Sequence, residues 1–253
     1  MKFETGMRRA LALILGCSLA ALAGAHAADK KDKAKAAGNQ TVDSGAFGVF
    51  VKGQRVATET FKIEQQNGIS IIKSELKETG GANPAWQKSE LQLSAGGELL
   101  RYEWSQSAGG SLSLFPDNDF LKEKITPPGQ TKPAEQAYLL PTTTPVLDNN
   151  FFIHREVLAW RYLAVAPCKN EKDARQCQSA DFGAVIPQDR TSMSVRLELV
   201  GKEKITIRGA ERELLRLNLS GEDLQWSLWV DENDHFKLIR VAIPADNTVV
   251  DRD

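Results

Sequence analysis

The chain has 253 residues, of which 26% are charged and 42% are hydrophobic, and its formal net charge is −1. Its 32 basic and 33 acidic residues leave no excess of positive charge of the kind that nucleic-acid-binding proteins carry. We therefore expect no nucleic-acid partner. The proportion of hydrophobic residues is typical of a globular domain with a core.

Residues 1–27 have the three parts of a secretory signal. A lysine and two arginines come first, an apolar run follows over residues 10–24, and small residues lead up to Ala27. We predict cleavage after Ala27 and a location in the periplasm or outside the cell. The apolar run is too short to span a bilayer comfortably, and no later segment reaches that length, so we expect no transmembrane segment. A lipoprotein anchored at Cys17 is the alternative, because Gly16 precedes this cysteine.

Residues 28–44 are rich in charged and small residues and contain few large apolar groups. Such a segment cannot bury enough surface to offset the entropy lost on ordering. We predict a disordered leader here, followed by a single all-β domain over residues 45–253.

Most segments of this domain alternate hydrophobic and polar residues. Residues 193–199 and 215–219 are examples, with leucine, valine or methionine at every second position. This period of two is typical of strands with one buried and one solvated face, and Gly, Asn and Asp between the runs indicate tight turns. We predict a mainly β fold, with a single curved antiparallel sheet or half-barrel of about ten to twelve strands.

Two segments depart from the alternation. Residues 126–147 contain five prolines, which remove backbone donors and fix φ, so we predict a surface crossover there. Residues 148–164 are predicted to form the one helix, packed across the sheet, with Asp148, Asn149 or Asn150 as its N-cap. Its apolar stripe comprises Leu147, Phe151, His154, Leu158 and Tyr162.

Two cysteines, Cys168 and Cys177, remain once the signal is removed. An even number of cysteines in an oxidising compartment favours a disulfide between them. They are too far apart in sequence for a Cys-x-x-Cys redox pair. Zinc needs about four ligands, and the spacing of His154 and His235 does not suggest a shared site. We therefore expect no metal.

Motifs for catalysis and cofactor binding are absent from the sequence. It contains no G-x-S-x-G and no phosphate-binding glycine loop, so we expect no cofactor. His154, followed by Arg155 and Glu156, is the one candidate general base. Because His154 falls on the apolar stripe, we favour a hydrogen-bonded packing role for it and a non-enzymatic protein.

A helix across a curved sheet leaves a concave apolar space, which is where small apolar ligands bind. The residues predicted to line it are Phe151, Phe152, Leu158, Tyr162 and Trp226. We expect the partner to be a lipid or another apolar small molecule, or an envelope protein. The alternatives are a structural or interaction protein with a filled core and no ligand, and a hydrolase that uses His154.

Two segments resemble known families. Residues 48–68, GVFVKGQRVATETFKIEQQNG, are similar to the first hairpin of secreted bacterial families of unknown function, and residues 226–250, WSLWVDENDHFKLIRVAIPADNTVV, resemble their closing hairpin. The resemblance covers residues 46–77 and 222–250. It implies an architecture distantly like that of periplasmic lipoprotein carriers of the LolA/LolB type, and it implies no catalytic residues. The proline-rich crossover and the two cysteines depart from that pattern.

Overall fold

The computed structural model describes residues 39–166 and 177–253. The predicted signal peptide, most of the predicted leader, Cys17 and Cys168 lie outside the described residues. The predictions that concern those segments therefore stay predictions.

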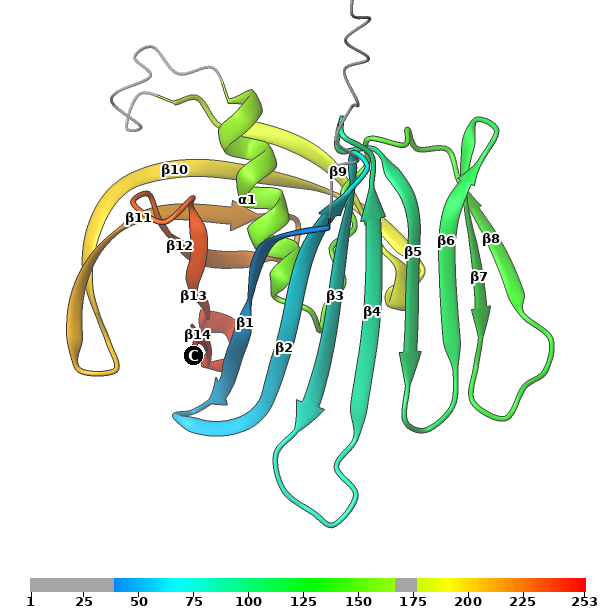
Figure 1. The fold of residues 1–253 in the computed structure, drawn as a ribbon, viewed down its shortest axis with the longest axis horizontal. Helices are drawn as coiled ribbons and strands as arrows, with labels where there is room; N and C mark the ends of the chain where they lie inside the picture. The colour runs from blue at the N-terminus through cyan, green and yellow to red at the C-terminus, as the bar shows by residue number, and fades with distance from the viewer. Residues whose placement is uncertain (1–38, 167–176) are drawn as a thin grey trace, which may run out of the picture. The chain divides into compact units, whose positions relative to one another are not determined.

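One antiparallel sheet of 14 strands makes up most of the described chain (Figure 1). Its strands are β1 (Gln40–Val51), β2 (Gln54–Gln66), β3 (Ile69–Glu78), β4 (Trp86–Leu93), β5 (Leu99–Gln106), β6 (Ser111–Asp117), β7 (Phe120–Thr126), β8 (Ala134–Tyr138), β9 (Ala180–Ile186), β10 (Thr191–Ile207), β11 (Ala210–Ser220), β12 (Gln225–Asp231), β13 (Lys237–Ile243) and β14 (Thr248–Arg252). Two short 3-10 helices, η2 (Pro187–Asp189) and η3 (Pro244–Asp246), follow β9 and β13.

The sheet consists of two meanders joined at one pair of strands. β1 to β8 pair in sequence, β9 to β14 pair in sequence, and β1 pairs with β14, where Val49 lies opposite Val250. The sheet is open, since β8 and β9 are its two end strands and do not pair with each other. The single antiparallel sheet of a mainly β fold is confirmed. The half-barrel alternative is wrong, because the sheet is neither closed nor strongly curled, and the strands outnumber the predicted ten to twelve.

One strand extends into a segment where the sequence predicted none, and another lies wholly within such a segment. β1 begins at Gln40, inside the predicted leader 28–44, and its first residues pair with the end of β2. Backbone pairing therefore orders a segment that has few apolar side chains. β8 lies within the predicted crossover 126–147, directly after Pro133, and pairs only with β7. A strand at the end of a sheet needs ladder bonds on one side only, so neighbouring prolines are tolerated.

The single helix of the described residues, α1 (Ile153–Val165), begins later than the predicted 148–164. Phe152 occupies the N-cap position and makes no capping side-chain hydrogen bond, so the predicted caps are wrong. Asp148 instead accepts a hydrogen bond from the backbone N–H of Asn150 at 2.9 Å and closes a turn ahead of the helix. All five residues of the predicted stripe are buried, but only His154, Leu158 and Tyr162 lie on α1, since Leu147 and Phe151 precede it.

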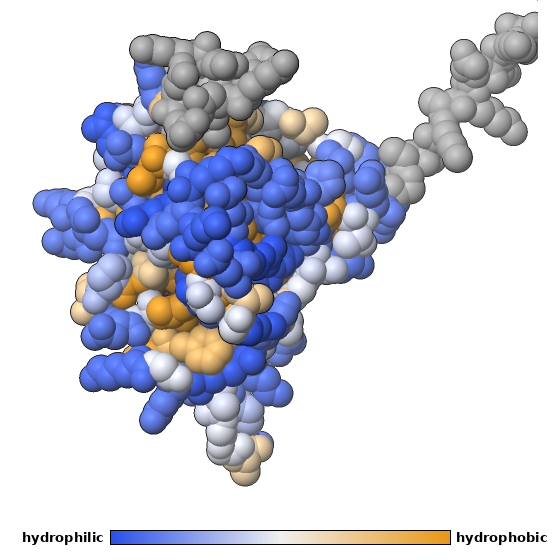
Figure 2. Space-filling view, turned by 90° about the vertical axis from the view of Figure 1, so that its left-hand side faces the viewer, coloured by the Kyte–Doolittle hydropathy of each residue, from blue (hydrophilic) through white to orange (hydrophobic). Residues whose placement is uncertain are grey.

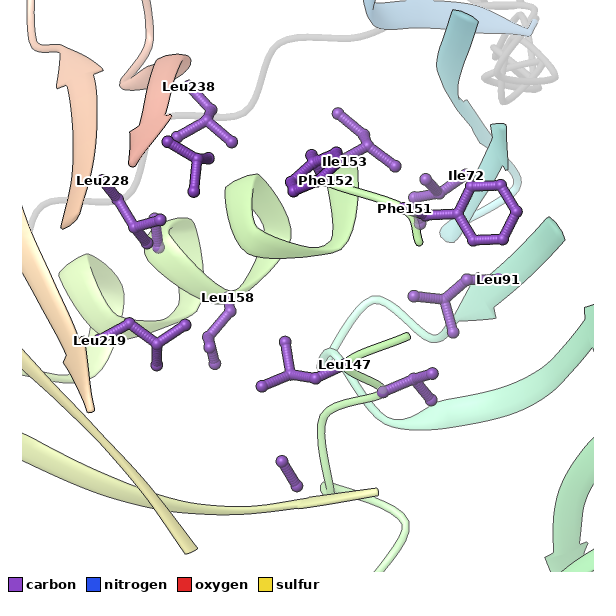
Figure 3. Close-up of a cluster of buried hydrophobic side chains, with 14 of the residues drawn as sticks. Ile72, Leu91, Leu147, Phe151, Phe152, Ile153, Leu158, Leu219, Leu228 and Leu238 are labelled. Atoms are coloured by element: carbon purple, nitrogen blue, oxygen red, sulfur yellow. The ribbon is translucent and has the colours of Figure 1, made fainter. Parts of the chain in front are cut away.

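α1 packs on one face of the sheet, between side chains from its two meanders (Figure 3). Leu219, Leu228 and Leu238, from β11 to β13, lie on one side of the helix. Ile72 of β3 and Leu91 of β4 lie on the other side. These residues belong to one continuous cluster of buried hydrophobic side chains, so the two meanders share a core.

The opposite face of the sheet is mainly polar. Figure 2 shows one side of the molecule, where hydrophilic side chains cover most of the surface and hydrophobic side chains show in patches between them. Cross-strand ion pairs such as Lys73–Glu90, at 3.6 Å, lie along β3 and β4 on this face. Four buried residues make a small second apolar cluster there, namely Ile207, Leu214, Trp229 and Ile239. The strands therefore alternate as predicted, with a solvated face and a face that carries the helix.

Candidate functional site

An apolar pocket of about 480 Å³ opens between the C-terminal half of α1 and the ends of β1 to β4. The turn after β4 and residues 144–146 complete its wall. Its volume lies within the range of small-molecule sites, roughly 300–1,000 Å³. The lining residues are Val42, Ile63, Gln65, Ser70, Ile72, Leu91, Leu93, Ser94, Ala95, Gly96, Gly97, Thr144, Pro145, Val146, Val157, Leu158, Trp160, Arg161, Ala164 and Val165.

The helix side of the pocket is a second stripe, distinct from the one that fills the core. Val157, Trp160, Arg161, Ala164 and Val165 are spaced three and four positions apart, so they share one face of α1. The spacing of these five residues is visible in the sequence. The stripe through His154 and Tyr162 is more apolar, however, and is therefore the one predicted to be the buried face of the helix. The sheet side follows the strand period of two.

The predicted ligand-lining residues divide between pocket and core. Leu158 lines the pocket and points into the space between Leu147 and Leu219 (Figure 3). Phe151 and Tyr162 are fully buried in the core. The rings of Phe152 and Trp226 contact each other, with centroids 6.3 Å apart. The space between helix and sheet is thus filled around the start of α1 and open around its end.

Glu59 of β2 binds the N-terminus of α1. Its buried carboxylate accepts hydrogen bonds from the backbone N–H groups of Phe152 at 2.7 Å and Ile153 at 3.3 Å, and from Ser74 Oγ at 2.7 Å. Helix N-termini favour negative charge. Burial nevertheless raises the pKa of Glu59 to about 7, against which these hydrogen bonds and the nearby Arg155 act. Glu59 supplies the cap that no local side chain provides.

Arg155 and Asp148 form the centre of a buried polar cluster at the same end of the helix. The Arg155 guanidinium donates to the carbonyl oxygens of Asp148 and Phe151, and its Cζ lies 4.5 Å from the centre of the Trp226 ring. Asp148 accepts from the Tyr102 hydroxyl. Burial raises the pKa of Asp148 to about 6. These contacts fix the turn that leads into α1.

Glu156 ties the helix to the junction of the two meanders. It accepts a hydrogen bond from the backbone N–H of Leu238 at 2.7 Å and one from Arg252 at 3.0 Å. Arg252 also binds Asp43 of β1, at 2.5 Å. Burial raises the pKa of Glu156 well above its ordinary value. The helix is thereby connected to β1, β13 and β14.

His154 is buried between two aromatic rings. Its ring centroid lies 5.8 Å from that of Tyr102 and 5.9 Å from that of Phe151. Neither ring nitrogen has a hydrogen-bond partner among the described residues, so the expected hydrogen-bonded role is wrong in that respect. Burial lowers the pKa of His154 to about 3 and keeps the imidazole neutral. Among the described residues, no serine or carboxylate is hydrogen-bonded to its nitrogens in the arrangement that activates a nucleophile.

The described part of the chain brings together no group of three or more metal-ligating side chains. Cys177 is partly buried against the core, whereas Cys168 lies outside the described residues. The predicted Cys168–Cys177 disulfide therefore stays a prediction.

Among residues 39–166 and 177–253, no helix combines the length and the apolar character that crossing a membrane requires.

A scan against protein-family models and searches of curated proteins and of solved structures found no match to this chain. The resemblance of residues 46–77 and 222–250 to secreted bacterial families, and through them to carriers of the LolA/LolB type, stays a prediction.

Proposed function

We propose that this is a non-enzymatic binding protein of the periplasm or the cell exterior, which holds an apolar chain, such as a lipid acyl chain, in the pocket between α1 and β1 to β4. The observation that carries the proposal is the pocket itself, which lies beside a well-filled core and is lined mainly by aliphatic side chains. Each square ångström of apolar surface that a ligand removes from water contributes about 25 cal/mol.

The rim of the pocket supports the same function. Val42 and Val165 line it and are 44% and 58% exposed, so apolar surface is available where a chain would enter. A filled core without a ligand, the first alternative, leaves this open space without a role. The hydrolase alternative would require His154 to exchange protons with a substrate, but its side chain is only 1% exposed.

The test fills the pocket from its exposed side. Ala164 lines the pocket on the helix, so an Ala164→Trp variant places a large ring in the cavity without overpacking the core. We expect the wild type to take up a fluorescent fatty-acid probe and Ala164→Trp to lose at least about tenfold in affinity, or about 1.4 kcal/mol.

Leu139→Trp is the matched control, since Leu139 is 78% exposed and does not line the pocket. It should bind the probe like the wild type. Native mass spectrometry of protein from its own host should in addition show a co-purifying lipid. Failure of the wild type to take up the probe, or undiminished uptake by Ala164→Trp, contradicts the proposal.

A further inference from the structure

Arg161 is the one charged side chain that lines the pocket within the described part of the chain. It lies on α1 between Val157 and Val165, and no aspartate or glutamate shares the pocket wall with it. The pocket therefore has an apolar interior and a single positive charge.

Within residues 39–166 and 177–253, the Arg161 guanidinium has no partner of opposite charge. Every other arginine in residues 39–166 and 177–253 forms an ion pair or donates a hydrogen bond, whereas Arg161 does neither. Its Cζ lies 5.9 Å from the centre of the Phe182 ring. Partial burial lowers the pKa of Arg161, and no nearby carboxylate acts to raise it. A partly desolvated charge without a counter-charge is costly unless a ligand neutralises it.

We infer that the pocket selects a single-chain amphiphile with an anionic head group, and that Arg161 binds this head group while the chain lies against the aliphatic wall. This inference rests on the proposed function and names the class of ligand. A guanidinium binds a carboxylate or a phosphate through two parallel, charge-assisted hydrogen bonds, whereas a neutral head group lacks the negative charge and a cationic head group is repelled.

The placement of Arg161 on the helix fits this role. It shares its face of α1 with Val157 and Ala164, so a head group bound to Arg161 leaves the chain beside the helix. Ile72 and Leu91, on the opposite wall, are buried and present aliphatic side chains to that chain. The anionic head group of an amphiphile thus lies beside the Arg161 guanidinium, and its apolar chain lies beside aliphatic side chains.

The experiment compares four ten-carbon amphiphiles by isothermal titration calorimetry on the full chain, each below its micelle concentration. They are decanoate, decyl phosphate, decyl glucoside and decyltrimethylammonium. We expect the two anionic compounds to bind at least about tenfold more tightly than the other two. Tighter binding of decanoate indicates a fatty acid as the natural ligand, and tighter binding of decyl phosphate indicates a lipid phosphate.

Arg161→Gln should lower the affinity for the two anionic compounds by at least about tenfold and leave the affinity for decyl glucoside within about twofold of the wild-type value. Arg161→Lys keeps the charge without the planar fork, so it should give an intermediate loss. Arg101→Gln, which changes an arginine paired with Glu103 away from the pocket, is the control and should bind like the wild type. Equal binding of all four compounds, unchanged in Arg161→Gln, overturns this inference and leaves the proposed function standing. Failure of the wild type to bind any of them overturns both.

Discussion

At the scale of single residues, the polar groups around the start of α1 are the most informative. Glu59, Asp148, His154 and Arg155 are all buried, and each is held by contacts that join the helix to distant strands. Burial changes the pKa of an ionisable group only while the protein is folded, so the stability of the protein depends on pH where such a group titrates. His154 is the clearest case, because it has no hydrogen-bond partner among the described residues and burial dominates its pKa.

His154 should make stability depend on pH. Its pKa is about 3 when folded, against 6.5 as the ordinary value, so the unfolded chain takes up a proton as the pH falls below 6.5 and the folded chain does not. Stability from this group is therefore present above pH 6.5 and is lost as the pH falls toward 3. Between pH 8 and pH 5 the loss is about 2 kcal/mol.

A His154→Leu variant removes this loss. Relative to the wild type, it should be more stable at pH 5 than at pH 8 by about 2 kcal/mol, as measured by urea unfolding at both pH values. The raised pKa values of Glu59 and Asp148 make stability increase as the pH falls, which is the opposite of the effect of His154. Both groups are present in the wild type and in the variant, so their effect cancels in the comparison. An equal stability difference at the two pH values would show that His154 is not held neutral.

At the scale of elements, α1 depends on a cap from a remote strand. Glu59→Ala should destabilise the protein by about 2–4 kcal/mol, because it leaves the two buried backbone N–H groups of Phe152 and Ile153 without their acceptor. Glu59→Gln keeps one acceptor oxygen and should lose less than half of that. Glu64→Gln, on the solvated face of the same strand, is the control and should change stability by less than about 0.5 kcal/mol. Urea unfolding measures all three, and similar losses for Ala and Gln would contradict the capping role.

The same cap explains which features of the helix could be predicted. The buried face through His154, Leu158 and Tyr162 follows from local periodicity, whereas Leu147 and Phe151, predicted on the same stripe, precede α1. The start of the helix does not follow from local periodicity. The carboxylate that accepts the hydrogen bond from Phe152 N–H belongs to Glu59, 93 positions away, and no local pattern encodes it. β8 was missed for a related reason, since prolines argue against strands except at the end of a sheet, and strand order is not visible in a single sequence.

The pocket could be predicted from the sequence only in part. Leu158 was predicted to line it and does so, but most of its wall comes from strand ends and from the turn at Ser94–Gly97. Phe151 and Tyr162 were predicted beside it and lie in the core. Periodicity assigns side chains to faces, but whether facing side chains meet or leave a gap depends on distances that it does not contain.

At the scale of the whole molecule, one core joins the two meanders. Leu91 in the first and Leu228 in the second belong to the same cluster, and both lie beside α1 (Figure 3). Such a sheet should unfold in a single cooperative transition, although it has 14 strands.

Hydrogen exchange at increasing urea concentration tests this cooperativity. Peptides from β3 to β5 and from β11 to β13 should lose protection at the same midpoint, while the end strand β8 exchanges earlier. Leu228→Ala, which costs about 2–5 kcal/mol, should lower the midpoint of both groups equally. A shift confined to β11 to β13 would instead show two independently stable meanders.

The pairing of β1 with β14 has a consequence for the order of folding. The ion pair beside that junction joins Asp43 to Arg252, which are 209 positions apart, so this contact closes one of the longest loops in the chain. Contacts of such high sequence separation form slowly. Until β14 docks, β1 is an unprotected edge carrying Phe47 and Val49, which is a template for pairing with another chain. We therefore expect the docking of β14 to end the period in which the exposed edge of β1 can pair with another chain.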